Sequence, residues 1–229
     1  MYTVKFYTGD YHKRQLDANA DRAVAYVEHH FNSSSSDQAN YAVVVVGSNA
    51  SQVSRNWGRW YAQAVADQFG NRVGGDQGIL VGGWNGRGDG NVKHTDMPAV
   101  LLEPLFASNP QQAEAIRSDR GQAALARILV ESIRRFFPKG GLIAFSVGHK
   151  YKSSSPNDRG AAVVGGGWEA DYAEKVLQRA AQLLVEEAPA VQGRTLRVMQ
   201  GDKLLFETPV DEDAVVIWSS ERNLLSIPD

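Results

Sequence analysis

The chain has 229 residues, of which 43% are hydrophobic and 22% are charged. This is the composition of a globular protein, and the length suffices for one well-buried core. The formal net charge of −2 predicts no nucleic-acid partner, and no apolar run reaches the roughly 18 residues of a membrane-spanning helix, so no membrane insertion is expected. The absence of cysteine excludes disulfides and thiolate metal ligands. Composition leaves the oligomeric state open.

Predicted strands and helices alternate along most of the chain. Strands are indicated by short runs of β-branched and aromatic residues, and helices by apolar residues spaced three or four apart. The predicted strands are 2–7, 27–32, 41–48, 98–103, 140–149 and two within 194–210. The predicted helices are 17–26, 51–69, 109–118, 121–137 and 169–187. Residues 33–40 and the glycine-rich 73–94 are predicted loops.

This alternation predicts an α/β fold in which helices flank a mostly parallel central sheet. We expect a single domain over residues 1–229, with 194–229 as a C-terminal β extension. In such sheets, functional groups gather at the carboxyl ends of the strands. His30, Glu103 and His149 each lie at or just past the end of a predicted strand, so they are expected to converge.

The residue types at these ends suit a catalytic zinc site. Zinc commonly takes three protein ligands and leaves one position for water, and His-His-Glu is a known ligand set. The candidate ligands are His30, His149 and Glu169, and Glu103 is a candidate for proton transfer during attack by water. On residue types alone the alternatives stay open: a buried strand histidine, a core salt bridge at Glu103, and a helix-start carboxylate at Glu169.

Two blocks of the chain resemble the zinc-dependent N-acetylmuramoyl-L-alanine amidases of the Amidase_3 type. "HTDMPAVLLEPLFASNPQQAEAI" is similar to the late family segment that carries the catalytic carboxylate, which places it on Glu103. "AVAYVEHHFNSS" resembles the family's Ser-Ile-His-Ala-Asn strand, which implies a zinc ligand at His30 and the family's Asn at Asn32. "AFSVGHKYKSSSPNDRGAAVVGGGWEADYAEKV" resembles the opening family segment, which implies zinc ligands at His149 and Glu169.

The order of these blocks differs from that of the family. The segment resembling the family's beginning here follows the segment resembling its last helix, so the chain is predicted to be a circular permutation joined through "PKGG". The termini of compact domains often lie close together, which makes such a joint feasible. We therefore expect the strand that begins at Tyr2 to lie beside the strand that leads to His149.

The sequence departs from the family pattern at several positions. Gly-His-Lys replaces the usual Gly-His-Gly, and Gly9 stands where an Arg is expected. Glu28 replaces the usual Ser, and on a strand it shares a face with His30, where it would add charge near the metal. Residues 194–229 have no clear counterpart.

The resemblance implies a Zn²⁺ hydrolase that cleaves the amide between N-acetylmuramic acid and L-alanine in peptidoglycan or a soluble muropeptide. A related zinc peptidase is an alternative, in which Arg87 or Arg159 would bind a substrate carboxylate. A non-catalytic cell-wall-binding domain is a third hypothesis. No signal peptide is visible, so we expect a phage lysin (an endolysin) released by other means, or a protein that acts on wall fragments in the cytoplasm.

Overall fold

The computed structural model describes residues 1–185, 194–200, 203–210, 217–219 and 224–226. The chain divides into two compact units, Met1–Val185 and Glu186–Asp229. The first unit contains every candidate site residue. Within the described residues, no helix combines the length and the apolar character needed to cross a membrane.

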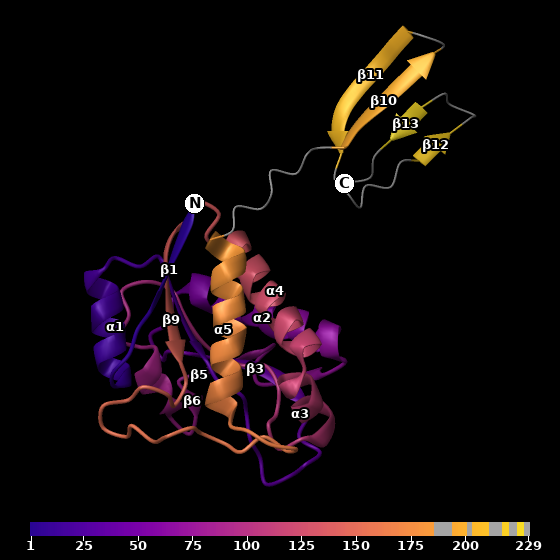
Figure 1. Cartoon of the computed structure of the whole chain (residues 1–229). Coiled ribbons are helices and arrows are strands. Elements are labelled where there is room, and N and C mark those ends of the chain that lie inside the picture. The colour runs from indigo at the N-terminus through magenta and orange to yellow at the C-terminus, as the bar shows by residue number, and fades with distance from the viewer. Residues whose placement is uncertain (186–193, 201–202, 211–216, 220–223, 227–229) are drawn as a thin grey trace. The chain divides into compact units, whose positions relative to one another are not determined.

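The first unit alternates strands with helices, as Figure 1 shows. Its helices are α1 (Tyr11–Ala20), α2 (Gln52–Phe69), α3 (Pro110–Arg117), α4 (Asp119–Phe136) and α5 (Glu169–Val185), with a 3-10 helix, η1, at Asp89–Asn91. Its strands are β1 (Tyr2–Phe6), β2 (Ala25–His29), β3 (Tyr41–Val46), β4 (Arg72–Val73), β5 (Ile79–Val81), β6 (Gly83–Trp84), β7 (Arg87–Gly88), β8 (Ala99–Glu103) and β9 (Gly141–Val147).

One seven-stranded sheet organises this unit. Its order is β1-β9-β2-β8-β3-β4, and β5 also pairs with β3. The neighbouring strands of this sheet are parallel except for β3 and β8, which are antiparallel. The predicted α/β fold with a mostly parallel central sheet is therefore confirmed.

Strand β9 lies between β1 and β2, although about 110 to 140 residues of sequence separate it from them. Tyr2 is opposite Gly141 in the β1–β9 pair, and His29 is opposite Val147 in the β2–β9 pair. Helix α5 packs against both β1 and β9 (Figure 1). The prediction that the first strand lies beside the strand leading to His149 is confirmed.

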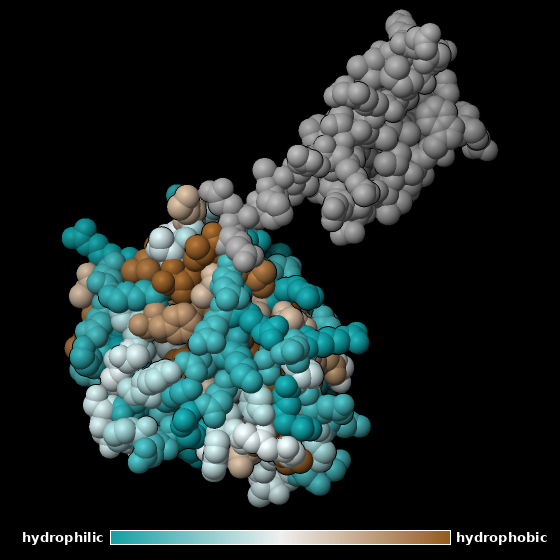
Figure 2. All heavy atoms as spheres, in the orientation of Figure 1, coloured by the Kyte–Doolittle hydropathy of each residue, from teal (hydrophilic) through white to brown (hydrophobic). Residues whose placement is uncertain are grey.

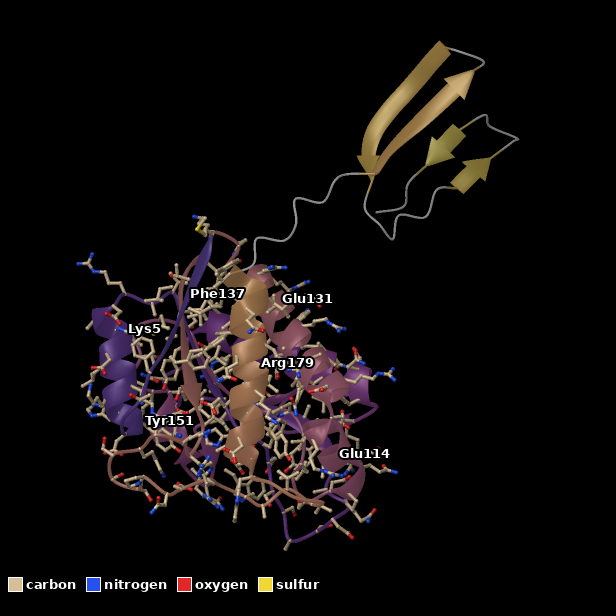
Figure 3. The ribbon with its side chains drawn as sticks, viewed as in Figure 1. Lys5, Glu114, Glu131, Phe137, Tyr151 and Arg179 are labelled. Carbon is tan, nitrogen blue, oxygen red and sulfur yellow. The ribbon has the colours of Figure 1, made fainter. Side chains whose placement is uncertain are left out.

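Helices cover the two faces of the sheet unequally. The larger core lies under α2, α4 and α5, where Trp57 and Tyr61 of α2 are fully buried. The smaller core, on the other face, includes Ala18 of α1 and Tyr26 of β2. Hydrophilic residues cover the outer side of α5 in Figure 2, as expected for a helix with its apolar stripe turned to a sheet. The side chain of Arg179, labelled in Figure 3, lies on this helix and pairs with Asp119 of α4.

Local signals set several helix ends. The side chain of Ser51 caps α2 by accepting a hydrogen bond from the Ser54 amide, and Gly70 closes the helix in the left-handed conformation. Asn109 and Ser118 cap α3 and α4 in the same way as Ser51.

Two predictions about local structure are wrong. The predicted helix at 17–26 instead spans Tyr11–Ala20, and Arg22 then adopts a φ of 56° before β2 begins at Ala25. Residues 24–26 are drawn into the sheet because Val24 and Tyr26 find backbone partners on Leu142 and Pro98. The glycine-rich stretch 73–94 is not only loop, since it contains β5, the β6–β7 hairpin and η1.

The second unit is described by its backbone ladders. β10 (Arg194–Gln200) pairs antiparallel with β11 (Lys203–Val210), which confirms the two strands predicted within 194–210. β12 (Ile217–Ser219) pairs with β13 (Leu224–Ser226). The last two residues of the predicted helix 169–187 lie outside the described residues.

Candidate metal centre

Parallel strands bring the predicted site residues to one edge of the sheet. His30 follows β2 directly, Glu103 ends β8, and His149 lies two residues beyond the end of β9. β2 pairs in parallel with both β8 and β9, so the carboxyl ends of these three strands are adjacent. Glu169 reaches the same edge as the first residue of α5.

Three of these residues form a compact group of donor atoms. One ligand atom from each of His30, His149 and Glu169 lies within 4.8 Å of the others. Glu169 Oε1 is 3.3 Å from His30 Nδ1 and 3.0 Å from His149 Nε2. Its other oxygen, Oε2, accepts a hydrogen bond of 2.8 Å from the Ala161 amide. One carboxylate oxygen is thus fixed by the backbone while the other faces both imidazoles.

The remaining nitrogen of each imidazole contacts a carboxylate. Nε2 of His30 is 2.8 Å from Glu28 Oε1. Nδ1 of His149 is 3.1 Å from both oxygens of Asp158. Metal-binding histidines usually donate their second ring N–H to such a partner. The arrangement therefore fits a metal ion held through His30 Nδ1, His149 Nε2 and Glu169 Oε1.

The backbone around the group is shaped to admit these side chains. A Cβ placed on Gly148 would lie 2.5 Å from the His30 ring. Gly160 has a φ of 71°, and a Cβ there would meet Glu169 at 2.5 Å and His149 at 2.7 Å. His149 has a φ of 61°, in the left-handed region that few residues other than glycine adopt. Such strain persists only where surrounding contacts enforce it, and it clusters at functional sites.

The charges of the group favour a bound cation. Burial works to raise the pKa of Glu169, but hydrogen bonds from His149 and His30 outweigh it and lower that pKa to about 2. Burial works to lower the pKa of His30, but hydrogen bonds to Glu169 and Glu28 raise it to about 10. The carboxylates thus stay ionised and attract positive charge at the imidazoles.

Glu103 differs from the other carboxylates because one of its oxygens has no partner. Oε2 is buried without a hydrogen bond to any described residue. Burial is the main cause that raises the pKa of Glu103, to about 7. Glu103 lines a cavity of about 870 Å³ together with His30, His149 and Glu169. A carboxyl with a pKa near neutrality beside the group of His30, His149 and Glu169 suits proton transfer.

The β6–β7 hairpin forms another wall of this cavity. Trp84, 67% exposed, and Arg87 line it, as does Asn32, three residues beyond the end of β2. Arg87 forms no ion pair within residues 1–185, whereas Arg159 pairs with Asp171. Arg159 is absent from the cavity wall. Of the two arginines considered for a substrate carboxylate, the structure places only Arg87 in the cavity.

Sequence reasoning missed two further residues of the site. Asp158 lies in the loop before α5 and contacts His149. Arg14 carries a fully buried guanidinium that donates to Ser146 Oγ and to the Val147 carbonyl. A signal for Asp158 was its place two residues before Gly160 in the loop that leads to Glu169. His29, on the opposite face from His30, is buried with both ring nitrogens unpartnered among the described residues.

These features define an α/β protein with a His-His-Glu group and a separate carboxyl at the carboxyl edge of its sheet. The family described as N-acetylmuramoyl-L-alanine amidase (Amidase_3) matches residues 3–135, more than half of the chain. The chain therefore belongs to this family. The match includes His30 and Glu103 and ends before the segment with His149 and Glu169. The comparison with curated proteins found no match.

Solved structures of several amidases are similar to the chain. The catalytic domain of CwlV, an N-acetylmuramoyl-L-alanine amidase from Bacillus (Paenibacillus) polymyxa var. colistinus, is 25% identical with a TM-score of 0.47, over 56% of this chain and 66% of that one. An N-acetylmuramoyl-L-alanine amidase from Clostridium difficile 630 is 21% identical with a TM-score of 0.48 and the same coverage. The catalytic domain of the CD27L endolysin, which targets Clostridia difficile, is 20% identical with a TM-score of 0.38, over 55% of this chain and 62% of that one. The chain thus spans just under two thirds of the length of these solved relatives.

Proposed function

We propose that the protein is a zinc-dependent amidase that hydrolyses the bond between N-acetylmuramic acid and L-alanine in peptidoglycan or its fragments. The observation that carries this proposal is the group of His30, His149 and Glu169 in one cavity with the unpartnered carboxyl of Glu103. Membership of the amidase family supports the reaction type. A purely wall-binding role would not need a buried carboxyl held without a partner beside three ligand atoms.

The donor set favours zinc among the common metal ions. Two imidazoles and one carboxylate with an open side are the ligands of many catalytic zinc sites, whereas calcium and magnesium prefer oxygen ligands. Zinc, when bound, supplies a Lewis acid that polarises a carbonyl and makes water a nucleophile near neutral pH. The cavity beside the three ligand residues is large enough for the substrate amide.

The residues that line and support the site have distinct roles in this reaction. Glu103 Oε2 accepts a proton from the attacking water and passes it to the leaving nitrogen of L-alanine. Asp158 and Glu28 hold the two imidazoles in fixed orientations. The Ala161 amide fixes Glu169. These supports keep the ligand atoms in place before the substrate arrives.

We also propose that the chain is a circular permutation of the family order. β9 and α5 together resemble the family's opening segment; β9 completes the central sheet, and α5 packs against β1 and β9. The end of α5 and the start of β1 lie at the same end of the unit (Figure 1), as the unpermuted connection would need. The joint between α4 and β9 is tight, because Gly140 N binds the Phe137 carbonyl and Gly141 N binds the Met1 carbonyl. The side chain of Tyr2 also donates to the Phe137 carbonyl, at the position labelled in Figure 3.

Two measurements test the proposed function. Elemental analysis of the purified protein should find one zinc per chain, and the His149→Ala variant should lose it because one of three ligands is gone. His12→Ala is the matched control, since His12 lies on α1, outside the group. Digestion of peptidoglycan should release peptides with an N-terminal L-alanine and leave the glycan uncut. New reducing sugar ends, or full zinc occupancy in His149→Ala, would contradict the proposal.

Arg87 favours a second candidate, a zinc peptidase that binds a free peptide carboxylate. Arg87 lines the cavity and forms no ion pair within residues 1–185, and arginine binds carboxylates in a two-pronged geometry. Release of D-alanine alone from wall peptides would identify this activity. Under the amidase proposal, Arg87→Ala would at most raise KM for peptides with a free carboxylate, and L-alanine would remain the new N-terminus.

A further inference from the structure

Glu28 is a charged side chain in the interior of the sheet. It is 0% exposed and lies on β2 two residues before His30, on the same face. Burying a carboxylate is costly unless hydrogen bonds replace its water. Since a hydrophobic residue at this strand position would avoid that cost, the carboxylate calls for an explanation.

Every side of the Glu28 carboxylate is occupied. Oε1 is 2.8 Å from His30 Nε2 and 2.5 Å from Asn91 Nδ2. Oε2 accepts a hydrogen bond of 2.9 Å from the Ser146 hydroxyl and lies 3.4 Å from the Tyr26 hydroxyl. The carboxylate therefore has one fixed orientation, set by groups from β2, β9 and η1.

A buried arginine supports the same arrangement from α1. Arg14 Nη1 donates to Ser146 Oγ at 2.8 Å, and Arg14 Nε donates to the Gly9 carbonyl at 2.7 Å. Because Ser146 Oγ accepts from Arg14, its own proton is directed to Glu28. The Ser146 hydroxyl thus bridges Arg14 and Glu28 by two hydrogen bonds, and both charged side chains are fully buried.

We propose that Glu28 is a positioning residue that fixes the tautomer of His30, so that Nδ1 of this histidine binds the metal. A carboxylate can only accept hydrogen bonds, so the contact places a proton on His30 Nε2. A neutral imidazole then has its lone pair on Nδ1, the atom that faces Glu169 Oε1. The negative charge also makes Nδ1 a stronger ligand. The inference rests on the proposed metal site and not on the identity of the substrate.

The other imidazole has the reverse arrangement. Asp158 contacts Nδ1 of His149, which leaves Nε2 of that ring for the metal. The site should therefore bind its metal through unlike nitrogens of its two histidines. This asymmetry is an observable property of the loaded protein that does not depend on activity.

Nuclear magnetic resonance of the full chain, loaded with ¹¹³Cd and labelled with ¹⁵N-histidine, tests the assignment without a mutation. The spectrum should show cadmium coupled to Nδ1 of one histidine and to Nε2 of another, and the Nδ1-bound ring should carry its proton on Nε2. Coupling through Nε2 of both rings would overturn the proposal.

Glu28→Gln tests the role of the charge. Glutamine keeps the shape and an oxygen that can accept the His30 proton, but it removes the negative charge. Zinc affinity, measured by competition with a chelator, should fall about 10- to 100-fold, the usual effect of losing such a support. Asp89→Asn is the matched control: it also removes one hydrogen-bonded carboxylate, but Asp89 contacts Ser48 and Lys93 and no ligand.

The possible outcomes separate this inference from the proposed function. Equal zinc affinities in wild type, Glu28→Gln and Asp89→Asn would overturn the role of Glu28 alone. A wild-type protein that binds zinc through unlike nitrogens but does not cleave peptidoglycan would support the role of Glu28 and contradict the amidase proposal. A wild-type protein that binds no zinc or cadmium would overturn both.

Discussion

Gly148 lies directly against the imidazole of His30, so close that a Cβ at position 148 would come within 2.5 Å of the ring. The contact joins the ends of β9 and β2, the two strands that deliver the histidines. Gly148→Ala should displace the His30 ring and weaken zinc binding at least tenfold, because ligand geometry tolerates little movement. Chelator competition measures the change. Gly90→Ala is the control, since a Cβ there meets nothing within 4 Å, and equal affinities in the two variants would show that the contact is unimportant.

The unpartnered oxygen of Glu103 leads to a prediction about catalysis. Glu103→Gln should keep one zinc per chain, because Glu103 is outside the ligand group. It should lose about 10²- to 10⁴-fold in kcat, since the amide cannot accept a proton. Rates of release of L-alanine-terminated peptides measure the loss. Full activity in this variant would leave the metal site standing and remove Glu103 from the mechanism.

Glu103 should also make the stability of the zinc-free protein depend on pH. Its pKa is raised in the folded state from 4.5 to about 7, mainly by burial, so the folded protein holds this proton more tightly than the unfolded chain. The stabilisation is fully present below pH 4.5 and is lost as the pH rises to about 7. Its upper bound is about 3 kcal/mol, and the partial opening of Glu103 to the cavity reduces it.

Urea unfolding of zinc-free wild type and Glu103→Gln between pH 4.5 and 8 isolates this effect. The free energy of unfolding of wild type should fall relative to that of the variant as the pH rises. A constant difference across this range would show that Glu103 titrates normally in the folded protein.

The proposed permutation can be tested by undoing it. A rearranged chain would place residues 140–185 first, a short flexible linker next, then residues 1–139, with residues 186–229 kept at the end. The start of β1 and the end of α5 lie at the same end of the unit, so the new connection should be short and the chain should fold. We expect one zinc per chain and unfolding in a single transition. Failure to fold with linkers of several lengths would count against the permutation.

Much of this fold follows from local sequence patterns, and the exceptions have physical causes. Ser51 and Gly70 mark both ends of α2 because capping depends on neighbouring residues. The predicted end of the first helix is too late in the sequence because the backbone at 24–26 forms hydrogen bonds with β9 and with the residue before β8. No local sequence pattern reveals these distant partners. Similarly, β5 forms within a glycine-rich stretch because the neighbouring strand β3 offers unpaired backbone groups.

The candidate site also has a part that the sequence predicts and a part that only the structure shows. His30, Glu103, His149 and Glu169 were predicted from short motifs to form the site, and the structure brings them to one cavity. The position of Glu28 beside His30 was expected from the strand pattern, but its hydrogen bond from Ser146, which is 118 residues away in sequence, was not. Only the three-dimensional structure shows which carboxylate contacts which histidine nitrogen.

The position of β9 between β1 and β2 also governs how the chain can fold. Tyr2 has its sheet partner at Gly141, so β1 stays without this neighbour during synthesis until some 140 further residues have followed. Pairings over such separations close large loops and slow folding. Until β9 arrives, β1 and β2 expose backbone edges that can pair with other chains. The metal group, which needs Glu169 from still later in the chain, is then the last part of the sheet edge to be assembled during synthesis.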